Sequence, residues 1–150
     1  LNPKYFMAYN NRGVLYEKQK QFNLAIGDYT KAIQINPQYA SAYYNRGENY
    51  LQQKQYNLAM ADVSMAIQIN PKYGNAYFSR GKIYQEQKQF DLAIGDYSQA
   101  ILLNPKDADA YYNRGKIYFQ QKRNDLAQAD YKKAVETNPA AFAKLPYTLP

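Results

Sequence analysis

The sequence contains no cysteine and no histidine, and these absences remove most of the side chains that build active sites. Without cysteine, disulfides and thiolate metal sites are excluded. Without histidine, the chain lacks the commonest general base, the commonest metal ligand and any Ser-His or Cys-His pairing. The seven glycines are dispersed, so there is no glycine-rich phosphate loop, and the acidic residues form no paired cluster. We therefore expect no enzymatic activity, no bound metal and no cofactor.

Long apolar runs are also missing. No stretch approaches the roughly 20 apolar residues of a membrane span, and the N-terminus has neither a signal-peptide pattern nor an initiator methionine. We interpret the chain as an excised fragment or a mature segment, which identifies no compartment, although a cytoplasmic one is favoured. The composition is that of a globular protein, with 46% hydrophobic and 21% charged residues and no run typical of disorder.

A dipeptide, Asn-Pro, recurs every 34 residues along the whole chain, starting at Asn2, Asn36, Asn70, Asn104 and Asn138. This step divides the chain into a leader, four aligned units and a tail, at residues 1–5, 6–39, 40–73, 74–107, 108–141 and 142–150. Each unit keeps a tyrosine, a glycine and a second tyrosine in its first half and two alanines in its second half. Such self-similarity is the mark of a repeat protein.

Each unit has the spacing of two helices. In the first unit, Tyr9, Gly13 and Tyr16 lie at i, i+4 and i+7, which is one face of a helix, and a second helical pattern starts at Leu24. Asn-Pro ends the unit, because proline pushes the preceding residue out of the helical region. We predict helices at 6–19, 23–35, 40–53, 57–69, 74–87, 91–103, 108–121 and 125–137. The predicted N-caps of the second helices are Asn23, Asn57, Asp91 and Asp125.

A glycine in the middle of each first helix needs a physical reason, since it costs about 1 kcal/mol relative to alanine. Its repetition indicates a close approach of two helices, with Gly13 facing Ala25 in the first unit and equivalent pairs in the others. One helical hairpin cannot bury both of its faces. We therefore expect the four hairpins to stack, each touching only its neighbours.

The residues Tyr, Gly, Tyr, Ala, Tyr, Ala and Pro at these offsets resemble the tetratricopeptide repeat signature across residues 6–141. The resemblance implies an all-α fold, a right-handed superhelical α-solenoid of four antiparallel hairpins, whose first helices line a concave groove. It also implies a protein–protein interaction module or scaffold. Val63 departs from the pattern by replacing an aromatic residue. The turn inside each hairpin, often glycine in the family, should be slightly strained or differently shaped here, since it carries Lys20, Lys54, Lys88 and Lys122.

Residues that differ between the units, at helical spacing, are free to specialise. On the first helices they form a stripe about 200° round from the Tyr/Gly/Tyr face. Its members are Asn10, Val14 and Glu17; Tyr44, Glu48 and Leu51; Phe78, Lys82 and Gln85; and Tyr112, Lys116 and Phe119. Two interpretations of its aromatic residues stay open: they anchor a partner, or they pack on the adjacent hairpin.

Beside this stripe stands one amide or hydroxyl per unit: Asn11, Asn45, Ser79 and Asn113. An amide can donate and accept together, so this row could pair with the backbone of an extended peptide, similar to the asparagine ladder of longer superhelical tetratricopeptide proteins. Alternatively, each side chain bonds a neighbouring helix. The chaperone-type carboxylate clamp is not supported. Of its positions only Asn45 fits, and the mismatches are Asn10, Val14, Asn75 and Ser79.

From the stripe and the row together we predict a peptide-binding site. Its residues are Asn10, Asn11, Tyr44, Asn45, Phe78, Lys82, Tyr112, Asn113, Lys116 and Phe119. The aromatic rings would take apolar side chains, and the two lysines would take a carboxylate. The expected partner is a peptide with apolar residues and at least one acidic group or a free C-terminus.

An arginine precedes an aspartate by 16 residues in every unit: Arg12 and Asp28, Arg46 and Asp62, Arg80 and Asp96, Arg114 and Asp130. A pairing that all four copies keep indicates a structural role. We expect each guanidinium to meet an aspartate of its own or the adjoining hairpin, where such pairs specify register more than they add stability.

Two alternative functions stay open. The ends of the array could mediate self-association, since Leu1-Asn2-Pro3 is placed like the tail of a preceding unit and residues 140–150 begin like another first helix before Pro146 breaks it. The net charge of +7 and the row of turn lysines could instead follow the phosphates of RNA. The basic residues are dispersed, however, so a nucleic-acid partner is disfavoured, and no membrane partner is expected.

Overall fold

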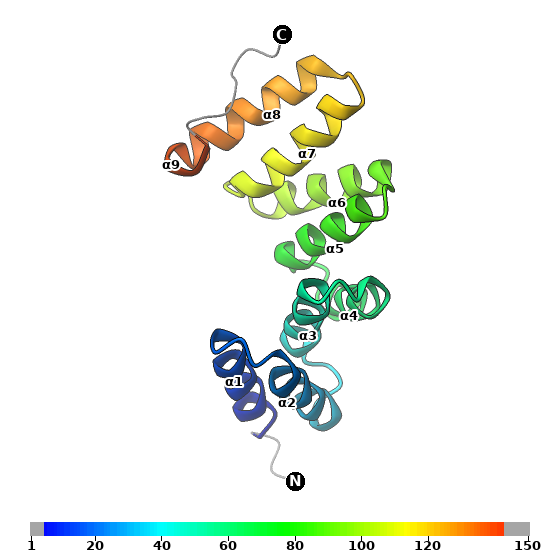
Figure 1. The fold of residues 1–150 in the computed structure, drawn as a ribbon, viewed down its shortest axis with the longest axis vertical. Helices are drawn as coiled ribbons and strands as arrows, with labels where there is room; N and C mark the ends of the chain where they lie inside the picture. The colour runs from blue at the N-terminus through cyan, green and yellow to red at the C-terminus, as the bar shows by residue number, and fades with distance from the viewer. Residues whose placement is uncertain (1–4, 143–150) are drawn as a thin grey trace. The chain divides into compact units, whose positions relative to one another are not determined.

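The structure, a computed structural model, describes residues 5–142, and within that range the chain is helical with no strand. The helices are α1 (Tyr5–Lys18), α2 (Phe22–Ile35), α3 (Ala40–Gln52), α4 (Tyr56–Ile69), α5 (Gly74–Glu86), α6 (Phe90–Leu103), α7 (Ala108–Gln120), α8 (Asn124–Thr137) and α9 (Pro139–Phe142) (Figure 1). The prediction of an all-α fold built from consecutive helical hairpins is confirmed over these residues.

The chain divides into two compact units, Leu1–Ser79 and Arg80–Pro150, with the boundary inside α5. In the first unit α1 packs on α2 and α3 on α4, and α2 also packs on α3. In the second unit α7 packs on α8, and α6 packs on α7. The first helices α1, α3 and α7 therefore each touch the second helix of their own hairpin, and α3 and α7 also touch the second helix of the hairpin before.

The predicted N-caps are wrong. Asn23 lies inside α2, and the residues that flank the second helices are Gln21, Gln55, Gln89 and Arg123, none of which makes a side-chain cap bond. The turn before the helix explains the difference. The backbone N–H of Gln21 donates to Tyr16 O at 2.9 Å, and Gln21 O then accepts from Leu24 N, so Gln21 already opens the helix. Each second helix therefore begins one residue earlier than predicted, and α1, α3, α5 and α7 end one residue earlier.

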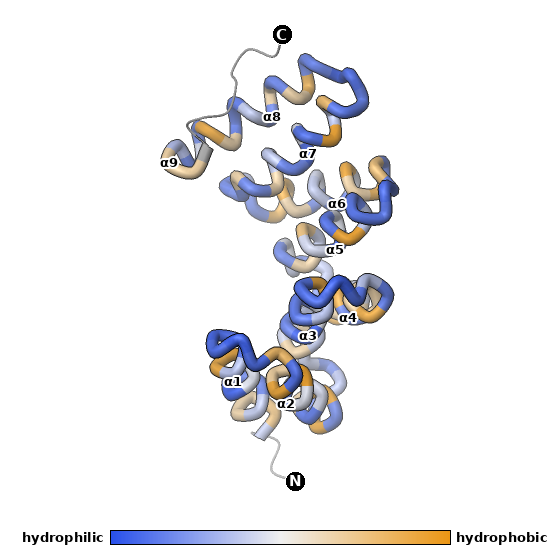
Figure 2. The backbone as a smooth tube through the Cα atoms, viewed as in Figure 1, coloured by the Kyte–Doolittle hydropathy of each residue, from blue (hydrophilic) through white to orange (hydrophobic). Residues whose placement is uncertain are grey.

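The lysine turns adopt the left-handed backbone conformation, which agrees with the expectation that they are strained or differently shaped. The φ angles of Lys20, Lys54, Lys88 and Lys122 are 59°, 58°, 59° and 60°. In the first hairpin Lys20 N donates to Glu17 O at 2.8 Å, which together with the bond from Gln21 N forms a Schellman ending. A side chain in this conformation costs roughly 1–2 kcal/mol relative to the right-handed region. These turns are hydrophilic (Figure 2).

Asn-Pro ends the second helices as predicted. Asn36, the C-cap of α2, is extended, with φ −132° and ψ 92°, and its side-chain oxygen accepts the backbone N–H of Gln38 at 3.1 Å. The same bond recurs from Lys72 N to Asn70 and from Lys106 N to Asn104. The asparagine therefore closes the helix and starts the following turn, which explains its place before each proline.

The mid-helix glycines allow the close approach that was predicted, but the facing residue is different. A Cβ on Gly13 would lie 2.6 Å from Cε1 of Tyr29, and the three atoms nearest to it all belong to that ring rather than to Ala25. Gly81 meets Tyr97 in the same way, at 2.8 Å. Tyr29 and Tyr97 are fully buried, so each ring occupies the hairpin interior next to the glycine.

The predicted leader and the predicted tail are described only in part. Tyr5 begins α1 and α9 ends at Phe142, whereas the rest of the predicted leader 1–5 and of the predicted tail 142–150 lies outside the described residues. Among the described helices, none combines the length and the apolar character needed to cross a membrane.

Candidate functional site

The arginines predicted to be structural join the two helices of each hairpin. Each forms two parallel hydrogen bonds with the aspartate of its own hairpin, at distances between 2.6 and 2.9 Å for Arg12–Asp28, Arg46–Asp62, Arg80–Asp96 and Arg114–Asp130. The aspartates are buried. The side-chain hydrogen bonds with Asp62 raise the pKa of Arg46. The prediction of an arginine–aspartate ladder is confirmed, within rather than between hairpins.

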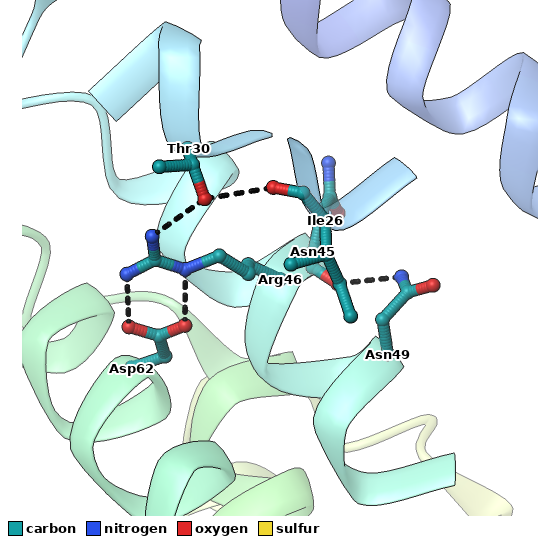
Figure 3. A network of polar contacts seen from close by, with 6 residues as sticks. All are labelled: Ile26, Thr30, Asn45, Arg46, Asn49 and Asp62. Atoms are coloured by element: carbon teal, nitrogen blue, oxygen red, sulfur yellow. Dashed lines mark hydrogen bonds and ion pairs between the residues drawn. The ribbon is translucent and has the colours of Figure 1, made fainter. Parts of the chain in front are cut away.

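A third bond extends this network to the preceding hairpin (Figure 3). Nη1 of Arg46 donates to Oγ1 of Thr30 at 3.0 Å, and the Thr30 hydroxyl donates to Ile26 O at 2.7 Å. In the second unit Nη1 of Arg114 donates to Ser98 at 2.8 Å, and Ser98 donates to Ile94 O. These hydroxyls were not predicted from the sequence, although Thr30, Ser64 and Ser98 recur at the repeat period and Lys132 interrupts the series.

In the first unit, several predicted site residues are engaged within the protein. Asn10 is 6% exposed, and its side-chain oxygen accepts a hydrogen bond from Asn45 Nδ2 at 3.0 Å. The Tyr44 ring lies 4.9 Å from that of Tyr73. Burial, followed by the charge of Glu48, raises the pKa of Tyr44. Asn10 and Asn45 therefore bond to each other, and Tyr44 packs on Tyr73, within the first unit.

Glu17, a stripe residue, is also committed within the first unit. Its Oε2 accepts hydrogen bonds from the Tyr29 hydroxyl at 2.9 Å and from Nδ2 of Asn49 at 3.0 Å. Asn49 is fully buried and donates from the same nitrogen to Asn45 O (Figure 3). Burial and the hydrogen bond to Glu17 raise the pKa of Tyr29. This cluster was not predicted from the sequence. The polar Asn49, at a position that Ile83 and Ile117 occupy in later repeats, could have indicated it.

The fourth repeat presents the same stripe differently, on α7. The ammonium of Lys116 lies 5.5 Å from the centroid of the Tyr112 ring, one turn away, and the Tyr112 ring contacts Tyr131 at 5.9 Å. Phe119 is 43% exposed. Asn113 donates to Asp109 O of its own helix at 2.8 Å. We refer to Tyr112, Asn113, Lys116 and Phe119 as the α7 surface.

The remaining predicted site residues are dispersed. Asn11 is exposed on α1, whereas Phe78 and Lys82 are both half-buried on α5, on opposite sides of the unit boundary. Among the predicted residues, the structure brings Asn10 together with Asn45 and Tyr112 together with Lys116. Within residues 5–142, no group of three or more acidic side chains is placed to hold a metal ion.

Comparison with protein families agrees with this architecture. The tetratricopeptide repeat model matches residues 6–39, 40–73 and 108–140, and a second TPR repeat model matches residues 81–122. The chain belongs to the tetratricopeptide repeat family. Repeats of this family are non-catalytic protein-interaction scaffolds, so the chain is a protein–protein interaction module. No curated protein sequence matches it.

Solved structures of similar fold include three tetratricopeptide proteins. MamA is 26% identical, with a TM-score of 0.84 over 93% of this chain and 82% of that chain. The tetratricopeptide domain of Arabidopsis OM64 is 28% identical, with a TM-score of 0.75 over 78% of this chain and 97% of that domain. The first such domain of Spaghetti (RPAP3), bound to the HSP90 peptide SRMEEVD, is 25% identical, with a TM-score of 0.78 over 81% of this chain and 97% of that domain.

Proposed function

We propose that this tetratricopeptide module binds an extended peptide segment of a partner protein through its first helices, with the α7 surface as the main anchoring site, and that it has no catalytic role. The ligand is a peptide that places an apolar side chain next to a carboxylate. The carboxylate comes from an acidic side chain or from a free C-terminus.

The observation that carries this proposal is the charge at Lys116. No carboxylate within the described residues pairs with it, and its ammonium instead lies against the Tyr112 ring. An ammonium next to an aromatic face keeps its positive charge and can still donate hydrogen bonds to a ligand. Phe119, three residues further along the same face, exposes an apolar surface beside it. A carboxylate and an apolar side chain of a peptide match this pair.

A peptide backbone could bind alongside these side chains. Asn113 uses its amide nitrogen on Asp109 O, and its carbonyl oxygen is left to accept a backbone N–H of a ligand. The binding of the acidic peptide SRMEEVD to the Spaghetti (RPAP3) domain supports a peptide ligand with carboxylates. The carboxylate-clamp residues do not match here, since Asn10 and Val14 stand at two of the positions, so we place the anchoring site on the fourth repeat.

The test starts from a peptide library displayed with free and with amidated C-termini and selected on the full chain. We expect selected peptides to combine an apolar residue with a carboxylate. Lys116→Ala and Phe119→Ala should each weaken their binding by roughly 5- to 30-fold, which corresponds to the 1–2 kcal/mol of a typical anchoring residue. Isothermal titration calorimetry measures the change.

Lys132→Ala is the matched control, because it removes the same charge from an exposed position on α8. It should leave the affinity within about twofold, since a distant exposed charge acts only through screened electrostatics. Equal weakening by Lys116→Ala and Lys132→Ala would show that net charge, and not the α7 surface, drives binding. Selected peptides that bind the Lys116→Ala, Phe119→Ala double variant as tightly as the native chain would contradict the proposal.

A further inference from the structure

Every repeat exposes a leucine at the edge where the two helices of its hairpin are joined. Leu24, Leu58, Leu92 and Leu126 share one position of the repeat, and they are 53%, 50%, 53% and 43% exposed. Each lies in the first turn of a second helix. An acidic side chain at this position would stabilise the unpaired N–H groups of the helix, whereas leucine does not. The stability of the helices therefore does not explain the four leucines.

A lysine with a strained backbone lies four residues before each of these leucines. Lys20, Lys54, Lys88 and Lys122 have positive φ angles, and all four are exposed. Glycine would adopt this conformation without the steric cost of a side chain. The same edge of every hairpin thus carries one apolar and one cationic residue that the hairpin itself does not require. Exposed apolar groups beside charges are typical of a surface that binds a partner.

The surface is hollowed beside two of the leucines. Each hollow is lined by the five residues that run from the lysine to the leucine and by the glutamine that caps the next first helix. In the first unit, residues 20–24 and Gln53 line a hollow of about 620 Å³, which we call the first turn hollow. In the second unit, residues 88–92 and Gln121 line the second turn hollow, of about 340 Å³.

The first turn hollow is surrounded by positive charge. Lys18 and Lys20 are both exposed, and residue 23 is the neutral Asn23, so no acidic residue lies among residues 18–24. The nearest acid in the sequence, Glu17, accepts its hydrogen bonds from buried groups. An anionic ligand that also carries an apolar side chain is therefore complementary to this hollow.

The second turn hollow has the opposite charge balance. Glu86 and Asp91 replace the lysine and the asparagine of the first, and Lys88 is the one cation left among these three positions. The Nε2 of Gln121 donates to Oδ1 of Asp91 at 3.4 Å, a bond between the two hairpins that line the hollow. The second turn hollow is thus a matched comparison, with the same leucine and a charge that repels an anionic ligand.

We propose that the first turn hollow is an interaction surface separate from the α7 surface, and that it binds an acidic segment of a protein partner. An apolar side chain of this segment fills the hollow against Leu24, and carboxylates on either side of it pair with Lys18 and Lys20. The amide of Gln53 bonds to the backbone of the segment. A side chain can enter a hollow of this volume, whereas a flat layer of anionic lipid headgroups would leave it empty.

The experiment first removes the α7 surface, so that it cannot capture the ligand. A peptide library with amidated C-termini is selected on the full chain that carries Lys116→Ala and Phe119→Ala, and all binding is measured in this background by isothermal titration calorimetry. We expect the selected peptides to place an apolar residue between acidic ones. In NMR spectra their addition should shift the backbone amide signals of residues 20–24 and of Gln53.

Substitutions in the two hollows then separate the site from general charge. Leu24→Ser should weaken binding by roughly 5- to 30-fold, as the loss of an anchoring residue does. The Lys18→Gln, Lys20→Gln double variant should weaken it by roughly 3- to 25-fold, the combined effect of two exposed ion pairs. Leu92→Ser is the matched control and should leave the affinity within about twofold, because the second turn hollow does not bind. Circular dichroism checks that each variant keeps its helices.

A third variant transfers the charge of one hollow to the other. Asn23→Asp gives the first turn hollow the acid of the second, and it should weaken binding by at least about threefold, since the new carboxylate repels those of the peptide and competes for the lysines. Unchanged affinity of this variant would contradict the proposed charge complementarity.

Three further results would overturn the proposal. They are a selection that yields no binding peptide, equal weakening by Leu24→Ser and Leu92→Ser, and shifted amide signals that exclude residues 20–24. Vesicles of phosphatidylcholine and phosphatidylserine test the lipid alternative. We expect the chain not to sediment with them, whereas co-sedimentation that Leu24→Ser abolishes would assign the first turn hollow to a membrane surface instead.

Discussion

The stripes on the first helices of repeats one and four occupy the same positions of the repeat but carry different residues and make different contacts. In repeat one, Glu17 accepts two hydrogen bonds from buried groups and Asn10 accepts one from Asn45. In repeat four the same positions are Phe119, which is exposed, and Tyr112, which supports Lys116. The stripe is therefore hydrogen-bonded within the protein in repeat one, whereas in repeat four it leaves Phe119 exposed.

The interiors of the hairpins do not share this difference. In the first unit Gly47 faces Val63, whose Cγ2 would lie 2.8 Å from an added Cβ, and in the second unit Gly81 faces Tyr97 at the same distance. The bidentate arginine–aspartate pair is present in both. A repeat protein of this kind therefore keeps its internal contacts constant and diversifies the first-helix stripe. Substitutions in the hairpin interiors and in the first-helix stripe test this comparison of the two units.

The largest effect is expected where the two units are alike. Gly47→Leu and Gly81→Leu should each lower the free energy of unfolding by 1–3 kcal/mol or more, on the order of other overpacked cores, because the new side chain overlaps Val63 or Tyr97. Urea denaturation measures the loss. Gly95→Ala is the matched control, since nothing lies within 4 Å of its Cβ position, and it should raise stability by about 0.4–1 kcal/mol. Sensitivity of only one unit would end the claim of equivalent interiors.

The next effect distinguishes the two stripes directly. Glu17→Ala should lower the free energy of unfolding by about 1–3 kcal/mol, because it leaves the buried Tyr29 hydroxyl and Asn49 amide without their acceptor. Phe119→Ala, at the equivalent position, should cost less than about 1 kcal/mol, since much of its ring is already exposed. Both are measured by thermal and urea unfolding. Equal losses would mean that the stripe has the same role at both ends.

The smallest effect concerns the lysine turns, which again should behave alike in the two units. Lys54→Gly and Lys122→Gly should raise the free energy of unfolding by up to about 1 kcal/mol, because glycine adopts the positive φ without steric cost. Lys132→Gly, inside α8, should lower it by about 1 kcal/mol. An unchanged melting temperature for Lys54→Gly and Lys122→Gly would show that the φ of 58–60° carries no strain.

Repetition made much of this fold predictable. Four copies of one pattern identify the helices, the Asn-Pro stops and the arginine–aspartate pairs without any relatives, since a chance match at one position cannot recur at all four. The N-caps were mispredicted because Asn23 has the right chemistry but lies one residue inside the helix that the lysine turn opens. The partner of Gly13 was mispredicted because spacing shows which face a residue occupies and not which side chain reaches it.

The candidate site was predicted less well, for a related reason. Asn10, Tyr44 and Tyr112 share one position of the repeat, and no pattern in the sequence shows which of them is buried. That depends on the neighbouring repeat. Asn45 of the second repeat bonds to Asn10 of the first. Asn113 bonds to its own helix instead.

The repeat length, the helical hairpins, the Asn-Pro stops and the absence of histidine and cysteine chemistry follow from the sequence alone, because each of these depends on local backbone preferences or on composition. Which polar residues bond to neighbouring helices depends on the tertiary contacts: Glu17 accepts two hydrogen bonds, whereas Lys116 lies against the Tyr112 ring. The exposure of Leu15 and Arg12 on α1 likewise depends on these contacts. Burial is a property of contacts between repeats, so one position of the repeat can be buried in one copy and exposed in another, as Asn49 and Leu15 are.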